Sequence, residues 1–170
     1  KYGLEIIKAK KKLVGVNTHM ANKIVYHGLS NNLIKELKNS EIIKPEVYFN
    51  KDTRFDFLTE KKNQKSFIEV KNVTLFRNPI TAEFPDAITA RGSKHLLALI
   101  DATKKGYKTY IIFLVQIQNV ENFKIARDID NEYYKNYIAA KKAGINFLAY
   151  RCKISSKAIY IDKKIKIINE

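Results

Sequence analysis

The sequence has little cysteine and little glycine, and each scarcity excludes a class of function. Its single cysteine, Cys152, excludes an internal disulfide and a zinc site built from cysteines. Cys152 falls in a predicted strand, where we expect a small core residue, and such cysteine use is typical of the reducing cytoplasm. The 6 glycines form no glycine-rich loop of the kind that cradles phosphates. This absence argues against a metal phosphohydrolase that acts on small nucleotides.

Long apolar runs are also missing from the sequence. The longest, residues 110–115, has the length of a strand, whereas a membrane helix needs about 20 apolar residues. We therefore expect no membrane association. With 170 residues, of which 45% are hydrophobic, the chain is expected to form one α/β domain. A domain of this size buries roughly two thirds of its unfolded surface.

Acidic residues are scarce relative to basic ones. The chain has 17 Asp and Glu against 32 Lys and Arg, which gives a formal net charge of +15. Such a surplus favours a polyanionic partner, nucleic acid before an anionic membrane. Lysine far outnumbers arginine, and asparagine and isoleucine are abundant, so part of the surplus reflects composition bias. The remainder still exceeds what solubility requires, and it predicts nucleic-acid binding.

One stretch combines acidic and basic residues with the pattern of a buried strand. Residues 66–76 are apolar and β-rich, and strand alternation places Glu69 and Lys71 on one face. Asp56 lies in a second predicted strand, between two phenylalanines that would anchor it in the core. Two converging carboxylates form a hard-oxygen site for Mg²⁺ or Mn²⁺, and a neighbouring lysine can orient a water or steady a phosphate. Together these residues predict metal-assisted phosphodiester hydrolysis.

A simpler interpretation of this pair is an exposed row of ion pairs at a sheet edge. The same Glu-x-Lys spacing occurs twice more, in polar surroundings typical of a helix end and a turn, at Glu36/Lys38 and Glu60/Lys62. Only the pair within residues 66–76 lies in an apolar run. That context favours the metal site at this position.

Helical and strand periods alternate along the chain, with glycine or proline at several of their ends. Two short strands about a basic turn are expected within residues 1–16, and a proline-containing loop at 78–86. Apolar spacing predicts helices at residues 18–29, 31–39 (a short turn), 89–105 (from Thr89 or Ser93) and 131–142. Strands are predicted at residues 47–49, 54–59, 66–76, 108–117 and 145–153, with a terminal hairpin at 158–168.

The order of these elements indicates the fold class. Short turns separate the strands within residues 47–76, so they should form an antiparallel meander. Helices precede the later strands, which implies parallel crossovers. The expected class is therefore α/β, with a central mixed β-sheet flanked by helices.

Four blocks of the sequence fall in a recognisable order. They are V-N-T-H with Asn22 (residues 16–22), T-R-F-D-F (53–57), E-V-K-N-V-T-L (69–75) and a block at 84–96 with F-P-D-A, Thr89, R-G and K-H-L. In order and spacing they resemble the sugar fermentation stimulation protein A (SfsA) family of prokaryotes, over residues 14 to about 149. Two positions depart from the family pattern: Thr53 stands where serine is usual, and Asn72 where a small hydroxyl residue is common.

The resemblance implies a restriction-endonuclease-like core of the PD-(D/E)XK nuclease superfamily. It further implies a DNA-binding protein of low sequence specificity, sometimes linked to the regulation of sugar metabolism. Family members carry an OB-like domain ahead of the nuclease-like part. By that comparison, residues 1–13 are expected to be a remnant of the upstream domain or a linker from it, and residues 14–170 the nuclease-like domain.

With this resemblance, Asp56 and Glu69 are candidate metal ligands and, together with Lys71, candidate catalytic residues. Lys71 would orient the attacking water or offset charge on the phosphorane, or else form only a salt bridge to Glu69. Glu46, at the start of the first meander strand, is a third candidate ligand, although a solvated strand end explains it equally well. Glu36 is a weaker candidate of the same kind.

Six residues are candidates for contact with DNA: Arg54, Arg91, Lys94, His95, Asn17 and Asn22. Arg54 shares a strand face with Asp56 by the two-residue period, so it could grip a phosphate, or form an ion pair with Asp56 or Glu69. Arg91 and His95 lie four residues apart on one helix face, from which basic groups can follow the DNA backbone.

Other polar residues have a first explanation in the fold itself. Asn17, Thr18 and Asn22 could reach the site from the first helix, although capping of that helix explains Asn17 or Thr18 equally well. Asp86 is expected first to cap the helix that follows the proline loop, and second to be an acid near the metal. The remaining residues of this kind are interpreted as structural, in the core or at the surface: His19, His27, Tyr133, Tyr134 and Tyr137.

Two main functions compete. The first is a cytoplasmic Mg²⁺-dependent nuclease, or nuclease-like protein, that acts on DNA. The second is a non-catalytic DNA-binding or regulatory protein that keeps the carboxylates to position metal or phosphate. An intact Asp56/Glu69/Lys71 set favours catalysis, because a pure binder would do better with fewer acids facing a polyanion. No small-molecule cofactor is expected, and a homodimer is one of the open oligomeric states.

Overall fold

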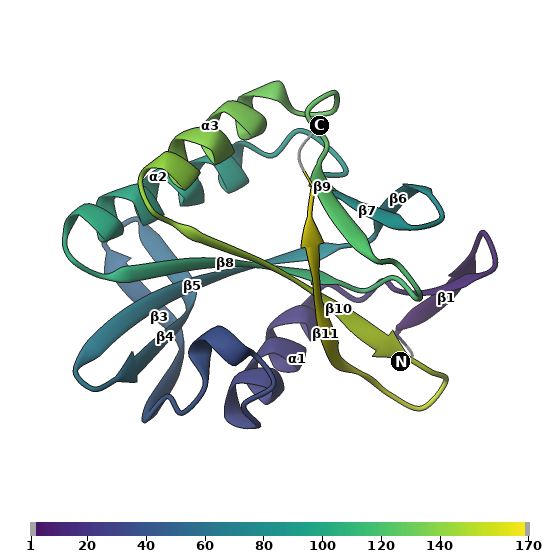
Figure 1. The fold of residues 1–170 in the computed structure, drawn as a ribbon, viewed down its shortest axis with the longest axis horizontal. Helices are drawn as coiled ribbons and strands as arrows, with labels where there is room; N and C mark the ends of the chain where they lie inside the picture. Colours follow the sequence, from purple (N-terminus) through teal and green to yellow (C-terminus); the bar gives the residue numbers. More distant parts are fainter. Residues whose placement is uncertain (1–2, 169–170) are drawn as a thin grey trace.

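The structure is a computed structural model that describes residues 3–168 of the 170-residue chain. Within that range one mixed sheet forms the centre of the molecule. Its strands, in spatial order, are β3 (Ile42–Asn50), β4 (Thr53–Lys61), β5 (Gln64–Val73), β8 (Lys108–Val115), β10 (Asn146–Ile154), β11 (Ile159–Ile167), β9 (Asn122–Ile125), β7 (Thr81–Phe84) and β6 (Leu75–Asn78). Helices α2 (Ala90–Lys104) and α3 (Asn131–Lys142) lie together on one side of it, and α1 (His19–Ser30) lies on the other (Figure 1). The expected α/β class with a mixed sheet flanked by helices is confirmed.

Strand directions follow the connections. The β3–β4 and β4–β5 pairs are antiparallel, as short turns require, whereas β5–β8 and β8–β10 are parallel and are joined through α2 and α3. Strand β8 lies at the centre of this arrangement and is buried from its second residue to its last. Its continuous apolar sequence is what a strand covered on both faces needs.

Two hydrophobic cores sandwich the sheet. The α2–α3 core contains Phe55, Leu96, Phe113 and Tyr133 among its buried side chains. On the opposite side the α1 core collects the apolar face of α1, whose three- and four-residue spacing brings these side chains to one stripe: Ile24, Val25 and Leu29. The sheet contributes Phe57, Ile68, Val70 and Ile112 to this second core.

A small hairpin precedes α1, as expected. Its strands β1 (Ile6–Ala9) and β2 (Lys12–Gly15) pair antiparallel around a basic turn in which Lys10 and Lys11 have positive φ. Val14 joins the α2–α3 core, and the Gly15 amide donates to the Gln116 carbonyl at 3.0 Å. The expected boundary between residues 13 and 14 thus falls inside β2, and its assignment to an upstream domain stays a prediction.

The two main crossover helices begin and end at recognisable residues. Thr89 Oγ1 accepts a hydrogen bond from the Gly92 amide at 3.0 Å, and Asp130 Oδ1 accepts one from the Tyr133 amide at 2.8 Å, so these side chains cap α2 and α3. Gly106 and Gly144, after the helix ends, adopt φ of +87° and +94°. The expectation that Asp86 caps α2 is wrong, because Thr89 does so.

Several elements differ from the sequence-based expectation. Strand β3 begins at Ile42 and runs through Pro45, which an edge strand tolerates because half of its amides face away from a partner. The proline-containing segment forms the β6–β7 hairpin, not a loop, and β9 was not predicted. The C-terminal segment is one strand, β11, which pairs with β10 and β9 and does not form a hairpin of its own. The expected turn at 31–39 is present only as η1 (Lys35–Leu37).

Among residues 3–168, no helix combines the length and apolar character that crossing a bilayer would demand.

Candidate carboxylate–lysine site

The candidate site lies where strands β4 and β5 separate. Their regular backbone pairing ends with Phe57 opposite Ile68. At the next residue of β4 the hydrogen bond is made by a side chain, because Asp56 Oδ2 accepts from the Val70 amide at 2.7 Å. Phe55 packs in the α2–α3 core and Phe57 in the α1 core, although residues two apart on a regular strand share a face. Strand β4 is therefore irregular at Asp56, and the carboxylate replaces a backbone acceptor there.

Asp56 is held from both sides and carries an unusual proton affinity. Its Oδ1 accepts from Asn22 Nδ2 of α1 at 2.8 Å. Burial, and then the negative charge of Glu69, raise the pKa of Asp56 to about 6, although the hydrogen bonds from Val70 and Asn22 oppose the shift. The expectation that Asn22 reaches the site from the first helix agrees with this contact; its role toward DNA stays a prediction.

Glu69 on β5 is almost fully buried, with 4% of its surface exposed. Its Oε1 accepts from Lys71 Nζ at 2.8 Å and contacts His95 Nδ1. Burial alone would raise the pKa of Glu69, but the hydrogen bond to His95 and the positive charge of Lys71 outweigh it, so the pKa is lowered. Its Oε2 is buried and has no hydrogen-bond partner among residues 3–168. Glu69 thus presents a charged oxygen that the surrounding protein leaves unsatisfied.

Lys71 is part of the same buried group. Its side chain is 11% exposed, and its Nζ forms the salt bridge to Glu69 Oε1. The structure contains the salt bridge that was one interpretation of Lys71, and that contact is compatible with a further role toward substrate. Ile68 and Val70 point to the opposite face, into the α1 core, as the strand alternation predicted.

His95 differs most from its predicted place. It was grouped with Arg91 and Lys94 as a basic residue facing DNA, but it is 8% exposed and its ring contacts Glu69 and packs edge-on to Phe55 at 6.4 Å. Arg91 and Lys94 are exposed on α2. Helix α2 turns its His95 face toward the sheet, so His95 belongs to the carboxylate site and not to the basic surface.

Tyr133 of α3 was not predicted to belong to this site. It is fully buried and its hydroxyl has no hydrogen-bond partner in the described part of the chain. Its pKa is raised well above the usual value, first by burial and then by the negative charge of Glu69. The sequence signal, a tyrosine at the third position of a helix, is indistinguishable from an ordinary core residue.

Glu46 and Arg54 form a separate pair at the edge strand. Glu46 Oε2 lies 2.8 Å from Arg54 Nε, with both side chains about half exposed, and the guanidinium also lies over the Tyr48 ring. Arg54 therefore pairs with neither Asp56 nor Glu69. Glu46 has φ of 55°, an uncommon backbone state for a residue other than glycine, at the position opposite Asp56.

The described residues bring together fewer possible ligands than the sequence suggested. Among them, no group of three His, Cys, Asp or Glu side chains is close enough to hold a metal ion, so Glu46 does not complete a cluster with Asp56 and Glu69. Glu36, the weaker candidate, pairs with Lys164 and with Tyr150. A divalent ion would depend on Asp56 and on the unpartnered Oε2 of Glu69, which is a hard-oxygen donor of the type that Mg²⁺ prefers.

Asn17 has partners outside the site. Its Oδ1 accepts from the His19 amide at 3.0 Å at the start of α1, and its Nδ2 donates to Glu5 Oε1 at 2.9 Å. Thr18, the other expected cap, makes no capping hydrogen bond through its side chain within residues 3–168. The helix-start role predicted for one of the two therefore falls to Asn17.

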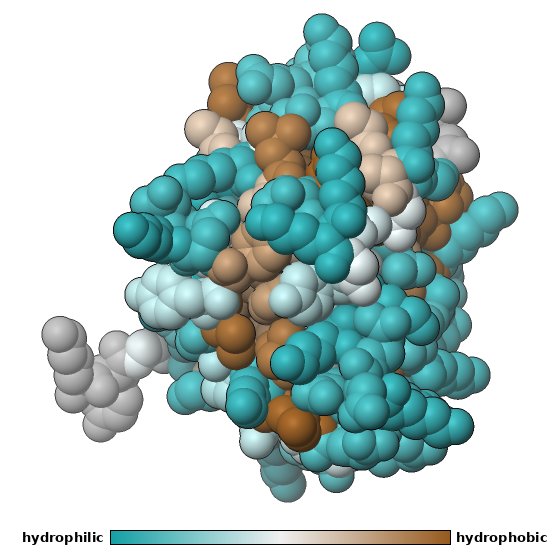
Figure 2. All heavy atoms as spheres, turned by 90° about the vertical axis from the view of Figure 1, so that its left-hand side faces the viewer, coloured by the Kyte–Doolittle hydropathy of each residue, from teal (hydrophilic) through white to brown (hydrophobic). Residues whose placement is uncertain are grey.

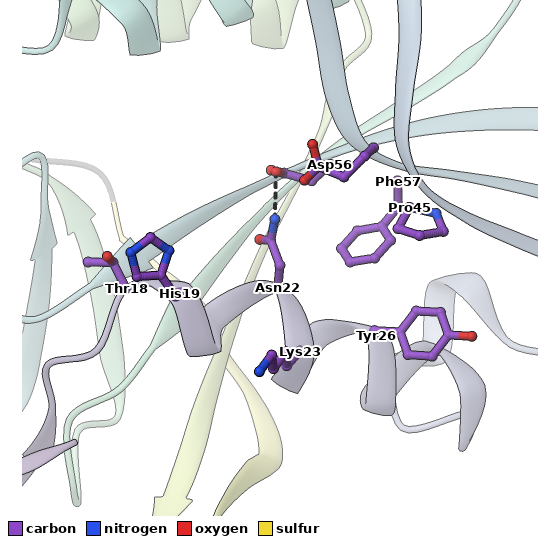
Figure 3. A pocket seen from close by; sticks show the side chains of 9 residues that line it. Thr18, His19, Asn22, Lys23, Tyr26, Pro45, Asp56 and Phe57 are labelled. Carbon is purple, nitrogen blue, oxygen red and sulfur yellow. Dashed lines mark hydrogen bonds between the residues drawn. The ribbon is translucent and has the colours of Figure 1, made fainter. Parts of the chain in front are cut away.

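A cavity of about 550 Å³ opens beside Asp56, between α1 and the β3–β4 strands (Figure 3). Its wall is formed by side chains of these elements: Thr18, His19, Asn22, Lys23, Tyr26, Pro45, Glu46, Asp56 and Phe57. In Figure 3 Asn22 reaches from the helix to Asp56, while Tyr26, Pro45 and Phe57 lie together at the other end. No pattern in the sequence predicted this cavity.

The fold and the site define an α/β protein with a buried carboxylate–lysine group between adjacent strands of a mixed sheet. The family model described as "Sugar fermentation stimulation protein RE domain" matches residues 19–158. A "Sugar fermentation stimulation protein homolog" of Pelagibacter ubique is 72% identical over 169 residues, which cover 99% of this chain and 73% of the relative. The homologue from Clostridium beijerinckii is 37% identical over 169 residues, with 99% and 73% covered.

The chain belongs to the SfsA family, the sugar fermentation stimulation proteins. A solved structure described as "The structure of Pyrococcus Furiosus SfsA in complex with Ca2+" has a TM-score of 0.89 and 24% sequence identity. The match covers 98% of this chain and 71% of the other. The two proteins therefore share a fold.

Proposed function

We propose that the protein binds DNA with low sequence specificity and carries a Mg²⁺-dependent site for phosphodiester hydrolysis on a nuclease-like fold. The observation that carries the proposal is Glu69: a buried, ionised carboxylate beside Lys71, with Oε2 unpartnered among the described residues and Asp56 on the next strand. The net charge of +15 supports a polyanionic substrate. The single cysteine, Cys152, is buried, which suits a cytoplasmic setting.

Each residue has a separate task in this proposal. Asp56 and Glu69 would hold a divalent ion, which when bound polarises a phosphate oxygen as a Lewis acid. Asn22 and the Val70 amide keep the Asp56 carboxylate in place through their hydrogen bonds. Lys71 would orient the attacking water and offset the negative charge that develops on the phosphate. The Ca²⁺ named for the Pyrococcus furiosus relative gives the family a precedent for a divalent ion.

One observation favours the alternative, a non-catalytic DNA-binding or regulatory protein linked to sugar metabolism. Glu69 Oε1 already contacts both Lys71 and His95, and Glu46 is paired with Arg54. A catalytic metal would then have few protein ligands and would need several waters. Mg²⁺ commonly binds to proteins in that way, through one or two carboxylates, so the catalytic proposal keeps priority.

Cleavage assays separate the two functions. Plasmid, branched and single-stranded DNA would be incubated with Mg²⁺ or Mn²⁺ and with EDTA, using wild type, Asp56→Asn and Lys71→Ala. We expect metal-dependent cutting by wild type and a loss of at least about 100-fold in both variants, because each removes a ligand or a charge that acts in the transition state. Lys153→Ala, an exposed lysine on β10, is the matched control and should cut normally.

The same assays can contradict the proposal. DNA binding without cutting in either metal, unchanged by both site substitutions, would leave the non-catalytic function. Circular dichroism and thermal melting of each variant would exclude loss of fold as the cause of lost activity.

A further inference from the structure

The cavity beside Asp56 has the size of a nucleotide site. Its volume of about 550 Å³ lies within the range of roughly 300–1,000 Å³ typical of small-ligand pockets. Because Asp56 lines it, a phosphate at the carboxylate site would have its sugar and base at the cavity mouth. Neither Glu69 nor Lys71 lines the cavity, so its side chains form a feature separate from the buried ion pair.

An aromatic wall forms the end of the cavity away from Asn22. Tyr26 of α1 is 45% exposed, and its ring is stacked on Phe57 with centroids 6.3 Å apart and planes inclined by 28°. Phe57 packs against the inner face of this ring and is itself only 2% exposed, so it holds the Tyr26 ring in place. Pro45 adds a flat apolar group (Figure 3). A large aromatic ring left half exposed inside a pocket is a stacking surface for another planar group.

The charges around the wall favour a nucleotide over an uncharged planar ligand. Lys23 and His19 lie three and seven residues before Tyr26 on α1, so they share its face of the helix, and both are exposed. Glu46 lies on the strand side of the cavity. In the absence of a bound ion, a phosphate would therefore lie on the Lys23 side, away from the carboxylates of Glu46 and Asp56. Figure 2 shows the side of the molecule that lies at the left of Figure 1, where hydrophilic side chains predominate and smaller hydrophobic areas lie between them.

We propose that this cavity binds one unpaired nucleotide, with its base against Tyr26 and its phosphate toward Lys23. A base within a duplex is stacked on both faces and cannot enter such a cavity unless it leaves the stack. The protein therefore prefers single-stranded or locally unpaired DNA to a continuous duplex. This inference rests on the proposed function for the identity of the polymer, but not on cleavage.

Binding measurements in EDTA test the cavity apart from catalysis. The probes are a fluorescein-labelled single-stranded oligonucleotide and a blunt duplex of the same sequence, each followed by fluorescence anisotropy. We expect wild type to bind the single strand more tightly. Tyr26→Ala should weaken single-strand binding at least about fivefold, the low end of the cost of losing one base stack. Tyr26→Phe keeps the ring and should bind as wild type does, and duplex binding should be the same in all three proteins.

A second probe reports stacking directly. An oligonucleotide with 2-aminopurine should lose fluorescence when wild type or Tyr26→Phe binds, and much less with Tyr26→Ala. The matched control is Tyr160→Ala, which removes a tyrosine that is 40% exposed on β11. Thermal melting of every variant shows that the fold persists.

The outcomes distinguish this inference from the proposed function. If Tyr26→Ala binds the single strand as tightly as Tyr160→Ala does, or if wild type does not prefer it over the duplex, the nucleotide cavity is overturned even where wild type cuts DNA. If the Tyr26 effect is present but no metal supports cutting, the cavity stands and catalysis fails.

Discussion

Asp56 changes its charge at a pH well above the range usual for an aspartate. Burial and the charge of Glu69 raise its pKa to about 6, from a usual value near 3.8. Between these values the folded protein binds the proton and the unfolded chain releases it, so the contribution of Asp56 to the free energy of unfolding falls as pH rises from about 4 to about 6. Across that window we expect the ion-free wild type to lose about 2–3 kcal/mol relative to Asp56→Asn.

Urea denaturation of both proteins at several pH values in EDTA measures this difference. A wild-type-minus-variant difference that stays flat between pH 4 and pH 7 would contradict the raised pKa. Taking the difference removes the effect of a group that does not interact with Asp56, such as Glu36, whose lowered pKa gives a stabilising contribution that is lost as pH falls.

The same carboxyl group makes metal binding depend on pH under the proposed function. A protonated Asp56 cannot act as a ligand, so the Kd for Mg²⁺ should rise about tenfold for each pH unit below about 6 and level off above it. Calorimetric titration with Mg²⁺ at a series of pH values tests this. Binding that is independent of pH between 5 and 7 would show that Asp56 is not a ligand.

His95 is expected to contribute to stability through Glu69. Removing its ring leaves a buried carboxylate with one partner fewer, and we expect His95→Ala to lower the free energy of unfolding by about 2–3 kcal/mol. Denaturant titration measures the effect. His27→Ala, on the exposed surface of α1, is the matched control and should stay within about 0.5 kcal/mol of wild type. Equal effects of the two substitutions would show that the contact between His95 and Glu69 does not stabilise the fold.

Among the elements, α2 is capped by the side chain of its N-cap residue, whereas the N-cap residue of α1 makes no such hydrogen bond within the described residues. Thr89 Oγ1 accepts from the Gly92 amide, whereas Thr18, at the corresponding position of α1, forms no such bond. We expect Thr89→Ala to lower the free energy of unfolding by about 1 kcal/mol, and Thr18→Ala by much less. Thr89→Ser should restore most of the loss, since it keeps the hydroxyl. Equal losses in the two alanine variants, measured in urea, would contradict this assignment.

Elements with strong local signals were predictable from the sequence. Helix α3 occupies the predicted residues because Asp130 begins it and Gly144 follows its end. Strand β8 was predictable from its continuous apolar run. By contrast, β7 and β9 have four residues each and exist because they pair with each other, with β7 at residues 81–84 and β9 at 122–125. No local pattern specifies a partner about forty residues away, so such strands depend on the assembled sheet.

The site was predictable to the extent that one strand contains it. Glu69 and Lys71 are two residues apart, so their shared face follows from the strand period. His95 joins them only because α2 packs against the sheet in one particular rotation, which its spacing to Arg91 does not reveal. The partner of Arg54 was missed for a similar reason, since the positive φ of Glu46 turns that residue in a direction that regular alternation does not foresee.

For the whole molecule, the net charge of +15 implies binding to DNA that weakens steeply with salt. Each phosphate that the protein neutralises releases counterions, so log K should fall against log salt with a slope of about −0.9 per contact. With about 4–8 contacts, the affinity for duplex DNA should drop by a factor of about 100 or more between roughly 50 and 200 mM salt. Anisotropy titrations at a series of salt concentrations measure the slope.

The double substitution Arg91→Ala/Lys94→Ala, on the exposed part of α2, should make the slope shallower by about 2, whereas Lys153→Ala/Lys157→Ala should leave it nearly unchanged. An affinity that does not change with salt would contradict DNA as the partner, and equal slopes for the two double variants would move the binding surface away from α2.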